Sequence, residues 1–227
     1  MKTDRTEYTI YFAGPLFDHK DLIGNALLSE AITETSDGKY RCILPQDLEQ
    51  FTDRAVDIRN QDLIHVMQCD LSIFNFDGTE LDSGTVVEFM YAKTLDIPAL
   101  IIRSDFRGSG DQKKDGDQWN LMASFYPRTR VLNFHAMDWY QATQSDLSND
   151  HDVFDIASIF YKRVARQVIR ELDAVMLDPP LLSYENGQAY ETYCWAVKFP
   201  GGALSEMKMT SEIKEIILSK KSKGLLS

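Results

Sequence analysis

Short apolar segments alternate along the chain with longer segments in which apolar residues recur every three or four positions. The short segments predict β-strands, because a brief apolar run bounded by Gly, Pro or Asp is typical of a strand buried in a parallel sheet. Residues 70–77, DLSIFNFD, are nearly continuous in apolar side chains and predict a central strand. The five predicted strands lie within residues 8–15, 40–45, 70–77, 98–104 and 130–135.

The longer segments predict helices between these strands. In residues 55–69, for example, Ile58, Leu63, Val66 and Met67 form one apolar stripe. The predicted helices cover residues 22–35, 55–69, 85–95 and 153–176. Strands that alternate with helices through right-handed crossovers predict an α/β fold. We expect a single flavodoxin-like or Rossmann-like, doubly wound, parallel five-stranded sheet.

Two segments depart from this alternation. Residues 108–117, GSGDQKKDGD, are polar and glycine-rich, which indicates a mobile loop or an active-site flap. Pro179 and Pro180 mark a boundary after the last long helix. We therefore divide the chain into a main domain, residues 1–177, and a small C-terminal extension of unknown role, residues 178–227. The final KKSKGLLS predicts a frayed basic end.

Composition narrows the classes of partner. The 227 residues are 44% hydrophobic, which is enough for one well-filled core. A net charge of -11 opposes binding to phosphate backbones and anionic lipids, so nucleic-acid polymers and membranes are poor candidate partners. The opening residues lack the apolar core of a signal sequence, and no run reaches membrane-spanning length. Three scattered cysteines indicate a reducing compartment, and we expect a cytoplasmic protein.

Metal chemistry has little support in the sequence. The four histidines, at 19, 65, 135 and 151, form no pair at ligand spacing. NDHDVFD, residues 149–155, is better interpreted as a solvated acidic loop that leads into a helix than as a metal site. We expect no metal and no cofactor.

Polar residues gather where the predicted strands end, and ligands bind at that edge of an open parallel sheet. In the helix that follows the third strand, Gly84, Glu88, Tyr91 and Leu95 share one face, so Glu88 is predicted to point inward. The alternative is a glutamate that only stabilises the positive end of the helix dipole. The small Gly84 beside it favours a position that another group can approach.

Other reaction classes lack their motifs. The sequence has neither of the two standard glycine-rich phosphate-binding loops. It also shows no recognisable Ser-His-Asp or Cys-His catalytic set. Carboxylates at the strand edge suit a reaction through a positively charged, sugar-like transition state, in which one acid attacks and another moves a proton. The candidates are Asp62, Asp77, Asp82 and Glu88, together with Tyr11.

Four ordered segments resemble the nucleoside 2-deoxyribosyltransferases: TIYFAGPLF, RNQDLIHVMQCDLSIFNFDG, LDSGTVVEFMYA and WNLMASF, within residues 8–134. The resemblance implies that residues 1–177 are the catalytic domain. It implies a retaining double displacement in which Glu88 attacks C1′ of a 2′-deoxynucleoside and forms a deoxyribosyl ester. It further implies that Tyr11 orients Glu88 and that Asp62 exchanges a proton with the base.

The resemblance also assigns substrate-binding residues. Asp82 would hold the sugar 5′-hydroxyl with help from Asn120, whose segment, including Met122, can come from a neighbouring subunit in this family. Asn120 as the cap of a short helix is the alternative. Phe17 would stack on the base unless it belongs to the core. The remaining assignments are Gly14, which follows the first strand, and, more loosely, Gln46 and Asp47 on base edges.

The partners implied are deoxynucleosides and free nucleobases in nucleoside salvage and catabolism, bound by a homo-oligomer with sites near subunit interfaces. The nearest rival is an N-glycosidase that uses water as the acceptor and acts on 5′-monophosphates. Those relatives carry a serine where this chain has Asp82, and an aspartate would repel a phosphate. A second rival is a non-catalytic nucleotide-sensing module. The 50-residue extension departs from the family pattern.

Overall fold

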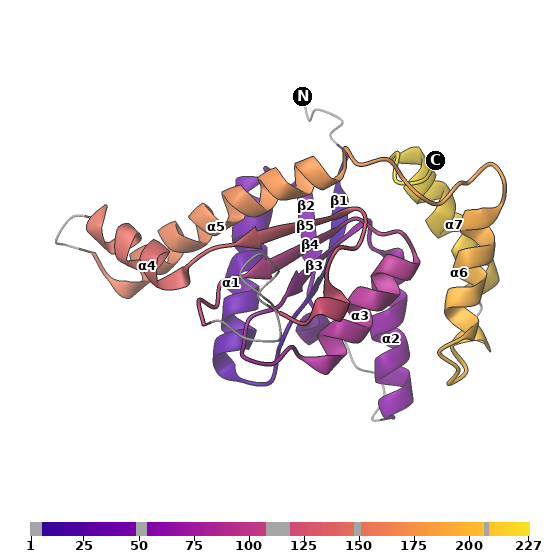
Figure 1. The fold of residues 1–227 in the computed structure, drawn as a ribbon, viewed down its shortest axis with the longest axis horizontal. Coiled ribbons are helices and arrows are strands. Elements are labelled where there is room, and N and C mark those ends of the chain that lie inside the picture. The colour runs from indigo at the N-terminus through magenta and orange to yellow at the C-terminus, as the bar shows by residue number, and fades with distance from the viewer. Residues whose placement is uncertain (1–5, 49–53, 108–118, 148–150, 207–208) are drawn as a thin grey trace.

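A computed structural model describes residues 6–48, 54–107, 119–147, 151–206 and 209–227 of the chain (Figure 1). The loop or flap predicted at 108–117 and the first part of NDHDVFD lie outside these residues. In the rest of that motif, Asp152 and Asp155 form a capping box at the start of α5, Val153–Val175. None of the helices in these ranges combines the length and the apolarity needed to cross a bilayer.

Five parallel strands form one sheet, which confirms the predicted α/β fold. The strands are β1 (Tyr8–Ala13), β2 (Tyr40–Ile43), β3 (Leu71–Asn75), β4 (Ala99–Arg103) and β5 (Thr129–Asn133). Their order in space is β2-β1-β3-β4-β5, with every neighbouring pair parallel. The chain reverses its direction of progress between β1 and β3, and the carboxyl ends at such a point form a crevice.

Two layers of helices bury the two faces of the sheet (Figure 1). Helix α1 (His19–Thr35) and α5 cover one face; α2 (Ala55–Gln68) and α3 (Ser83–Thr94) cover the other. Side chains alternate across β1, so Ile10 and Phe12 join the core under α1 and α5. Tyr11 joins the core under α2 and α3. This alternation places the Tyr11 hydroxyl on the same face as Glu88.

Side-chain caps move two helix starts away from the predicted positions. Helix α1 begins at His19, three residues early, because Asp18 Oδ1 accepts hydrogen bonds from the amides of Lys20 (2.7 Å) and Asp21 (3.0 Å). Helix α3 begins at Ser83 rather than near residue 85, because Asp82 is its cap. Helix α4, Ala136–Ser145, was not predicted, and neither were the two helices of the C-terminal extension. Three short 3-10 helices cover Pro45–Asp47 (η1), Leu121–Ala123 (η2) and Leu204–Glu206 (η3).

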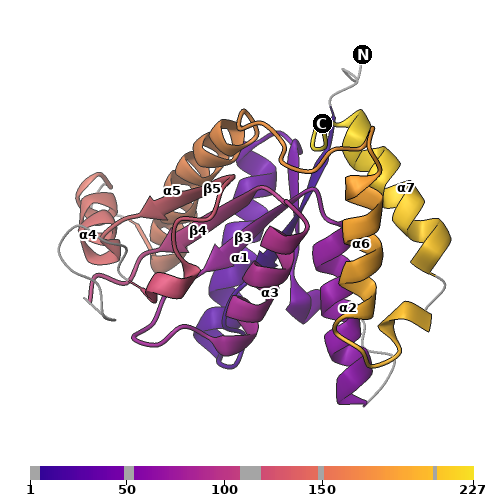
Figure 2. The same ribbon diagram turned by 45° about the vertical axis from the view of Figure 1, so that its right-hand side comes forward.

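The C-terminal extension contains α6 (Gln188–Lys198) and α7 (Met209–Ser222) and packs against the α2 and α3 side of the molecule (Figure 2). Tyr193 and Ala196 of α6 are fully buried in the same apolar cluster as Tyr91 of α3. The prediction of a frayed basic end is wrong. Lys220 is only 2% exposed and Leu225 and Leu226 are buried, because this segment packs under α2 and the start of β3.

Candidate active site

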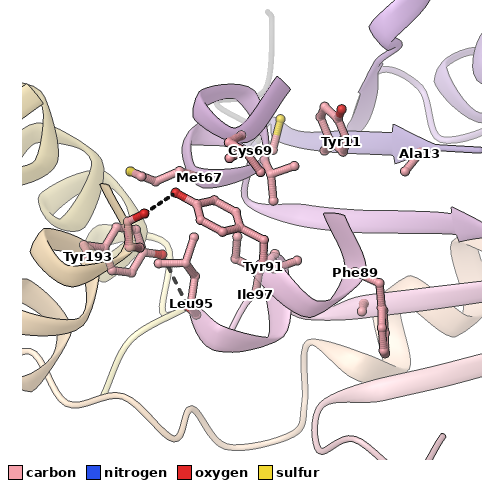
Figure 3. Close-up of a cluster of buried hydrophobic side chains, with 14 of the residues drawn as sticks. Tyr11, Ala13, Met67, Cys69, Phe89, Tyr91, Leu95, Ile97 and Tyr193 are labelled. Atoms are coloured by element: carbon pink, nitrogen blue, oxygen red, sulfur yellow. Dashed lines mark hydrogen bonds between the residues drawn. The ribbon is translucent and has the colours of Figure 1, made fainter. Parts of the chain in front are cut away.

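Glu88 and Tyr11 form a direct contact between α3 and β1. The Tyr11 hydroxyl donates a hydrogen bond to Glu88 Oε1 at 2.6 Å. Tyr11 is fully buried on the strand (Figure 3), and Glu88 is largely buried one turn into α3. Glu88 therefore points toward the sheet, as the helical pattern predicts. The contact joins residues 77 positions apart in the sequence, and only the parallel pairing of β1 with β3 brings their elements together.

Burial dominates the electrostatics of Glu88. The pKa of the Glu88 carboxyl is raised to about 7, chiefly by loss of solvent and also by the nearby charges of Asp62 and Asp82. The hydrogen bond from Tyr11 acts in the opposite direction and favours the ionised carboxylate. The pKa of Tyr11 is strongly raised, first by burial and then by the Glu88 charge, so the phenol remains a hydrogen-bond donor. Near neutral pH, the poorly solvated Glu88 carboxyl is therefore present in both its ionised and its protonated form, and the Tyr11 hydroxyl holds it in place.

Asp62 brings a second carboxyl into this electrostatic neighbourhood from α2. It is partly buried, and burial raises the pKa of its carboxyl to about 6, partly opposed by His65. Its charge acts on both Glu88 and Tyr11. Two carboxyls with pKa values displaced toward neutrality can hold one proton between them over the range where many enzymes operate.

Asp82 occupies the N-cap of α3. Its Oδ2 accepts hydrogen bonds from the Thr85 amide at 2.7 Å and the Thr85 hydroxyl at 2.8 Å. Gly84 lies so near this carboxylate that an added Cβ would stand 3.1 Å from Asp82 Oδ2. The Asp82 cap therefore accounts for the small residue at position 84.

A cavity of about 560 Å³ opens at the carboxyl ends of β1 and β3. Phe17 lies at its edge with 78% of its surface exposed, so the alternative that it belongs to the core is wrong. Gly14 lies beside the cavity, where a Cβ would come within 2.9 Å of Asn75 Cβ; only glycine permits this approach of β1 to β3. The lining also includes Asp21, Asn75, Asp77, Asp82 and Arg107.

A second cavity, of about 810 Å³, lies along α3 and η2 and shares the loop residues Thr79, Glu80, Leu81 and Ser83 with the first. Asn120 and Met122 line this second cavity rather than the first. The Asn120 side chain accepts a hydrogen bond from the Met122 amide at 2.9 Å and caps η2, which is the alternative role considered above. Met122 is 78% exposed. Asn120 therefore lies across the loop from the cavity that Asp82 lines.

Gln46 and Asp47 occupy η1 after β2. Gln46 Nε2 donates to the Leu22 carbonyl at 2.8 Å and so ties η1 to α1, while Asp47 is exposed. Neither residue is among those that line the two cavities.

Two rim residues have structural partners that the sequence did not reveal. The Asp77 carboxylate accepts hydrogen bonds from the Ser104 hydroxyl (2.6 Å) and the Asp105 amide (2.9 Å), so it joins the loops after β3 and β4. Arg103 is fully buried at the end of β4 and donates to the carbonyls of Phe76 and Gly78. Its guanidinium thereby shapes the loop that leads to Asp82. An arginine that ends an apolar strand is the only signal for it in the sequence.

The described residues hold no group of three or more His, Cys, Asp or Glu side chains arranged for a metal ion. Their chemistry is that of a hydrogen-bonded carboxylate with a second carboxyl nearby. Such a pair suits attack on an electrophilic carbon accompanied by a proton transfer.

Comparison with known proteins identifies this arrangement further. Residues 10–122 match the family model described as nucleoside 2-deoxyribosyltransferase. No curated protein matches the chain. The solved structures that are similar to it include the following three. A conserved protein from Enterococcus faecalis V583 has 26% identity and a TM-score of 0.48, over 63% of this chain and 100% of that one.

The second is a 2-desoxiribosyltransferase from Leishmania mexicana, with 28% identity and a TM-score of 0.42 over 52% of this chain and 86% of that one. The third is a 2-deoxyribosyltransferase from Bacillus psychrosaccharolyticus, with 17% identity and a TM-score of 0.42 over 65% and 95% of the two chains. The residues matched by the family model include most of β1 and all of α2 and α3, and these elements carry Tyr11, Asp62 and Glu88.

Proposed function

Residues 10–122 make this chain a member of the nucleoside 2-deoxyribosyltransferase family, and we propose that it moves a 2-deoxyribosyl group from one nucleobase to another. The observation that carries the proposal is the 2.6 Å hydrogen bond from the Tyr11 hydroxyl to Glu88 Oε1 inside a largely buried contact. A helix-capping glutamate has no need of such a partner. A nucleophile that must stay ionised without solvent does.

In the first step, a Glu88 oxygen attacks C1′ of the deoxynucleoside. A C1′–O ester bond forms, the C1′–N bond breaks, and the electron pair of that bond leaves with the base. Asp62 supplies the proton that the departing base nitrogen takes up. The Tyr11 hydroxyl keeps Glu88 oriented and ionised at the start of the step.

In the second step, a nitrogen of the incoming base attacks C1′ and its proton passes to Asp62. Glu88 leaves as a carboxylate. Two inversions give net retention at C1′. The first base leaves before the acceptor base binds. Burial of Glu88 limits the access of water, which would otherwise hydrolyse the ester.

The substrate is proposed to be a nucleoside rather than a 5′-monophosphate. Asp82 lines the 560 Å³ cavity with Asp21 and Asp77, and this concentration of carboxylates disfavours a phosphate. Phe17 supplies an exposed ring against which a base can stack. Asn120 faces a different cavity, so its proposed contact with the sugar is made in a neighbouring subunit of a homo-oligomer.

Base exchange tests the proposed function directly. The full chain is incubated with a 2′-deoxynucleoside, with and without a second free base, and the products are separated by chromatography. A new deoxynucleoside that appears only with the second base supports transfer. Free deoxyribose at the same rate in both reactions contradicts transfer and supports the N-glycosidase alternative. No reaction in either mixture contradicts both transfer and hydrolysis of a nucleoside.

The rate of exchange is expected to show a narrow pH optimum between pH 6 and 7. Glu88, with a pKa of about 7, must be ionised to attack, and Asp62, with a pKa of about 6, must be protonated to assist the leaving base. Since the two charges interact, the apparent pKa values belong to the pair. We expect kcat/KM for the donor to fall about tenfold per pH unit outside both values. Initial rates from pH 4.5 to 9 measure this profile.

Asp62→Asn provides the control for that assignment. It should lower the rate by about 10²-fold and abolish the decline at high pH, because the titrating donor is gone. Recovery of activity after return to pH 6.5 separates titration from unfolding. A wild-type profile that is flat from pH 5 to 9 would contradict the assignment of both carboxyls.

A further inference from the structure

The C-terminal extension holds α2 at both ends, and Asp62 lies between the two contacts. Near the start of the helix, Arg59 Nη1 donates to the Pro200 carbonyl and Arg59 Nη2 to the Gly201 carbonyl, each at 3.1 Å. At the end of the helix, the buried ammonium of Lys220 on α7 donates to the carbonyl of Cys69, the C-cap of α2. Figure 2 shows α6 beside this helix and α7 on the outer side of α6.

The first of these contacts is built around a buried amide. Asn60 is 1% exposed, and its Nδ2 donates to the Gly202 carbonyl at 2.7 Å. Its Oδ1 accepts from Arg59 Nη2, also at 2.7 Å, so one side chain links the turn to the guanidinium. A Cβ added to Gly202 would stand 2.6 Å from Val56 Cγ2 and would also collide with Arg59. The turn therefore approaches α2 as closely as a backbone can.

The extension also contacts α3 through two tyrosine hydroxyls. The Tyr91 hydroxyl, one turn after Glu88, donates to the Ala196 carbonyl of α6 at 3.2 Å, and the Tyr193 hydroxyl donates to the Leu95 carbonyl at 3.4 Å. Figure 3 shows Tyr91 pointing toward α6. The helices that carry Asp62 and Glu88 thus share one support outside the residues matched by the family model.

We propose that the 200–202 turn, with Arg59 and Asn60, is a positioning device that sets α2 so that Asp62 reaches the base. The inference rests on the proposed function of Asp62. Proton transfer depends steeply on donor distance, so a small tilt of α2 slows the chemistry. Phe17 and Asp82 lie on other elements, so substrate binding is little affected. Arg59 and Asn60 act through Asp62 and do not touch the substrate.

Two adjacent glycines provide a matched test. Gly201 and Gly202 have left-handed backbones, with φ of +63° and +65°, so alanine strains both alike. At Gly201 the added Cβ meets no described atom within 4 Å, whereas at Gly202 it meets α2. We expect Gly202→Ala to lower kcat for base exchange at least about tenfold with less than about threefold change in KM. Gly201→Ala should stay within about twofold of wild type.

Arg59→Ala is the second variant, because this exposed side chain can be shortened without opening the core. It should reproduce the loss of kcat in part, and hydrogen exchange of the α2 amides should be faster in both variants than in Gly201→Ala. The inference is overturned if folded Gly202→Ala and Arg59→Ala both keep the kcat of the wild type, with or without faster amide exchange. In that case, base exchange by the wild-type chain still supports the proposed function. If the wild-type chain itself exchanges no base, the proposed function is contradicted instead.

Discussion

Glu88→Gln is expected to slow base exchange at least about 10³-fold while making the folded chain more stable at pH 8. Glutamine keeps the size of the side chain and can still accept a hydrogen bond from Tyr11, but it cannot form an ester with C1′. Initial rates measure the loss. Intact-protein mass spectrometry after an acid quench should find an added deoxyribosyl group on the wild-type chain and none on Glu88→Gln.

The gain in stability follows from the sign of the pKa shift. Burial raises the pKa of the Glu88 carboxyl from 4.5 to about 7, so the ionised form destabilises the fold. This cost grows as the pH rises from 4.5 to about 7 and is fully present above 7. Removing the charge should therefore raise the free energy of unfolding by about 1–3 kcal/mol at pH 8, and the gain should vanish near pH 4.5. Urea unfolding at the two pH values measures it.

Glu191→Gln is the matched control, because Glu191 is an exposed acid in the first turn of α6. Its loss should weaken the favourable interaction with the helix dipole by less than about 1 kcal/mol and leave activity intact. If Glu88→Gln behaves like Glu191→Gln, with slight destabilisation and full turnover, Glu88 is only a helix-end acid. The opposite signs of the two stability changes separate these roles even before activity is measured.

The sheet and the inward position of Glu88 could be predicted because both depend on local patterns. Strands buried on both faces, such as Leu71–Asn75, are nearly continuous in apolar residues, whereas a surface helix has apolar residues only at every third or fourth position. The face of α3 that carries Glu88 follows from a spacing of 3.6 residues. The partnership with Tyr11 came from the family resemblance, since the spacing of residues alone says nothing about a contact across 77 positions.

Roles at the crevice could not be divided from the sequence, because the same side chains cap, brace and bind. Asp77 and Asp82 both follow β3, yet Asp77 is occupied by Ser104 and the Asp105 amide, and Asp82 holds the Thr85 amide. Asn120 caps η2 and faces a second cavity. Each alternative depends on the direction of one side chain, which residue type does not encode.

The extension was underestimated for a different reason. Its anchoring bonds join residues far apart in the chain, such as Tyr91 with Ala196 and Cys69 with Lys220. A buried lysine has the same sequence signature as a solvated one, so KKSKGLLS suggested a frayed end. Helix α4 escaped prediction because it is short and polar, with Thr143 as its only buried residue.

Asp96→Ala is expected to lower the free energy of unfolding by about 3–5 kcal/mol. Asp96 lies two residues after the end of α3, and its side chain is only 4% exposed. Its Oδ2 accepts from Arg128 Nη1 (2.7 Å) and from the amides of Leu181 (2.7 Å) and Leu182 (3.1 Å). Alanine leaves the arginine charge buried without its carboxylate and two amides without an acceptor. Arg128 also donates to the Leu225 carbonyl, so both ends of the extension should loosen together.

Asp178→Ala provides the comparison, because Asp178 pairs with Arg130 at the same distance of 2.7 Å but with both side chains partly exposed. A solvent-screened pair contributes at most about 1 kcal/mol. Urea unfolding should therefore separate the two variants by more than about 2 kcal/mol, and limited proteolysis should cleave Asp96→Ala faster between residues 178 and 187. Equal, small losses in both variants would mean that the extension is held by its apolar contacts, with the Asp96–Arg128 pair contributing little.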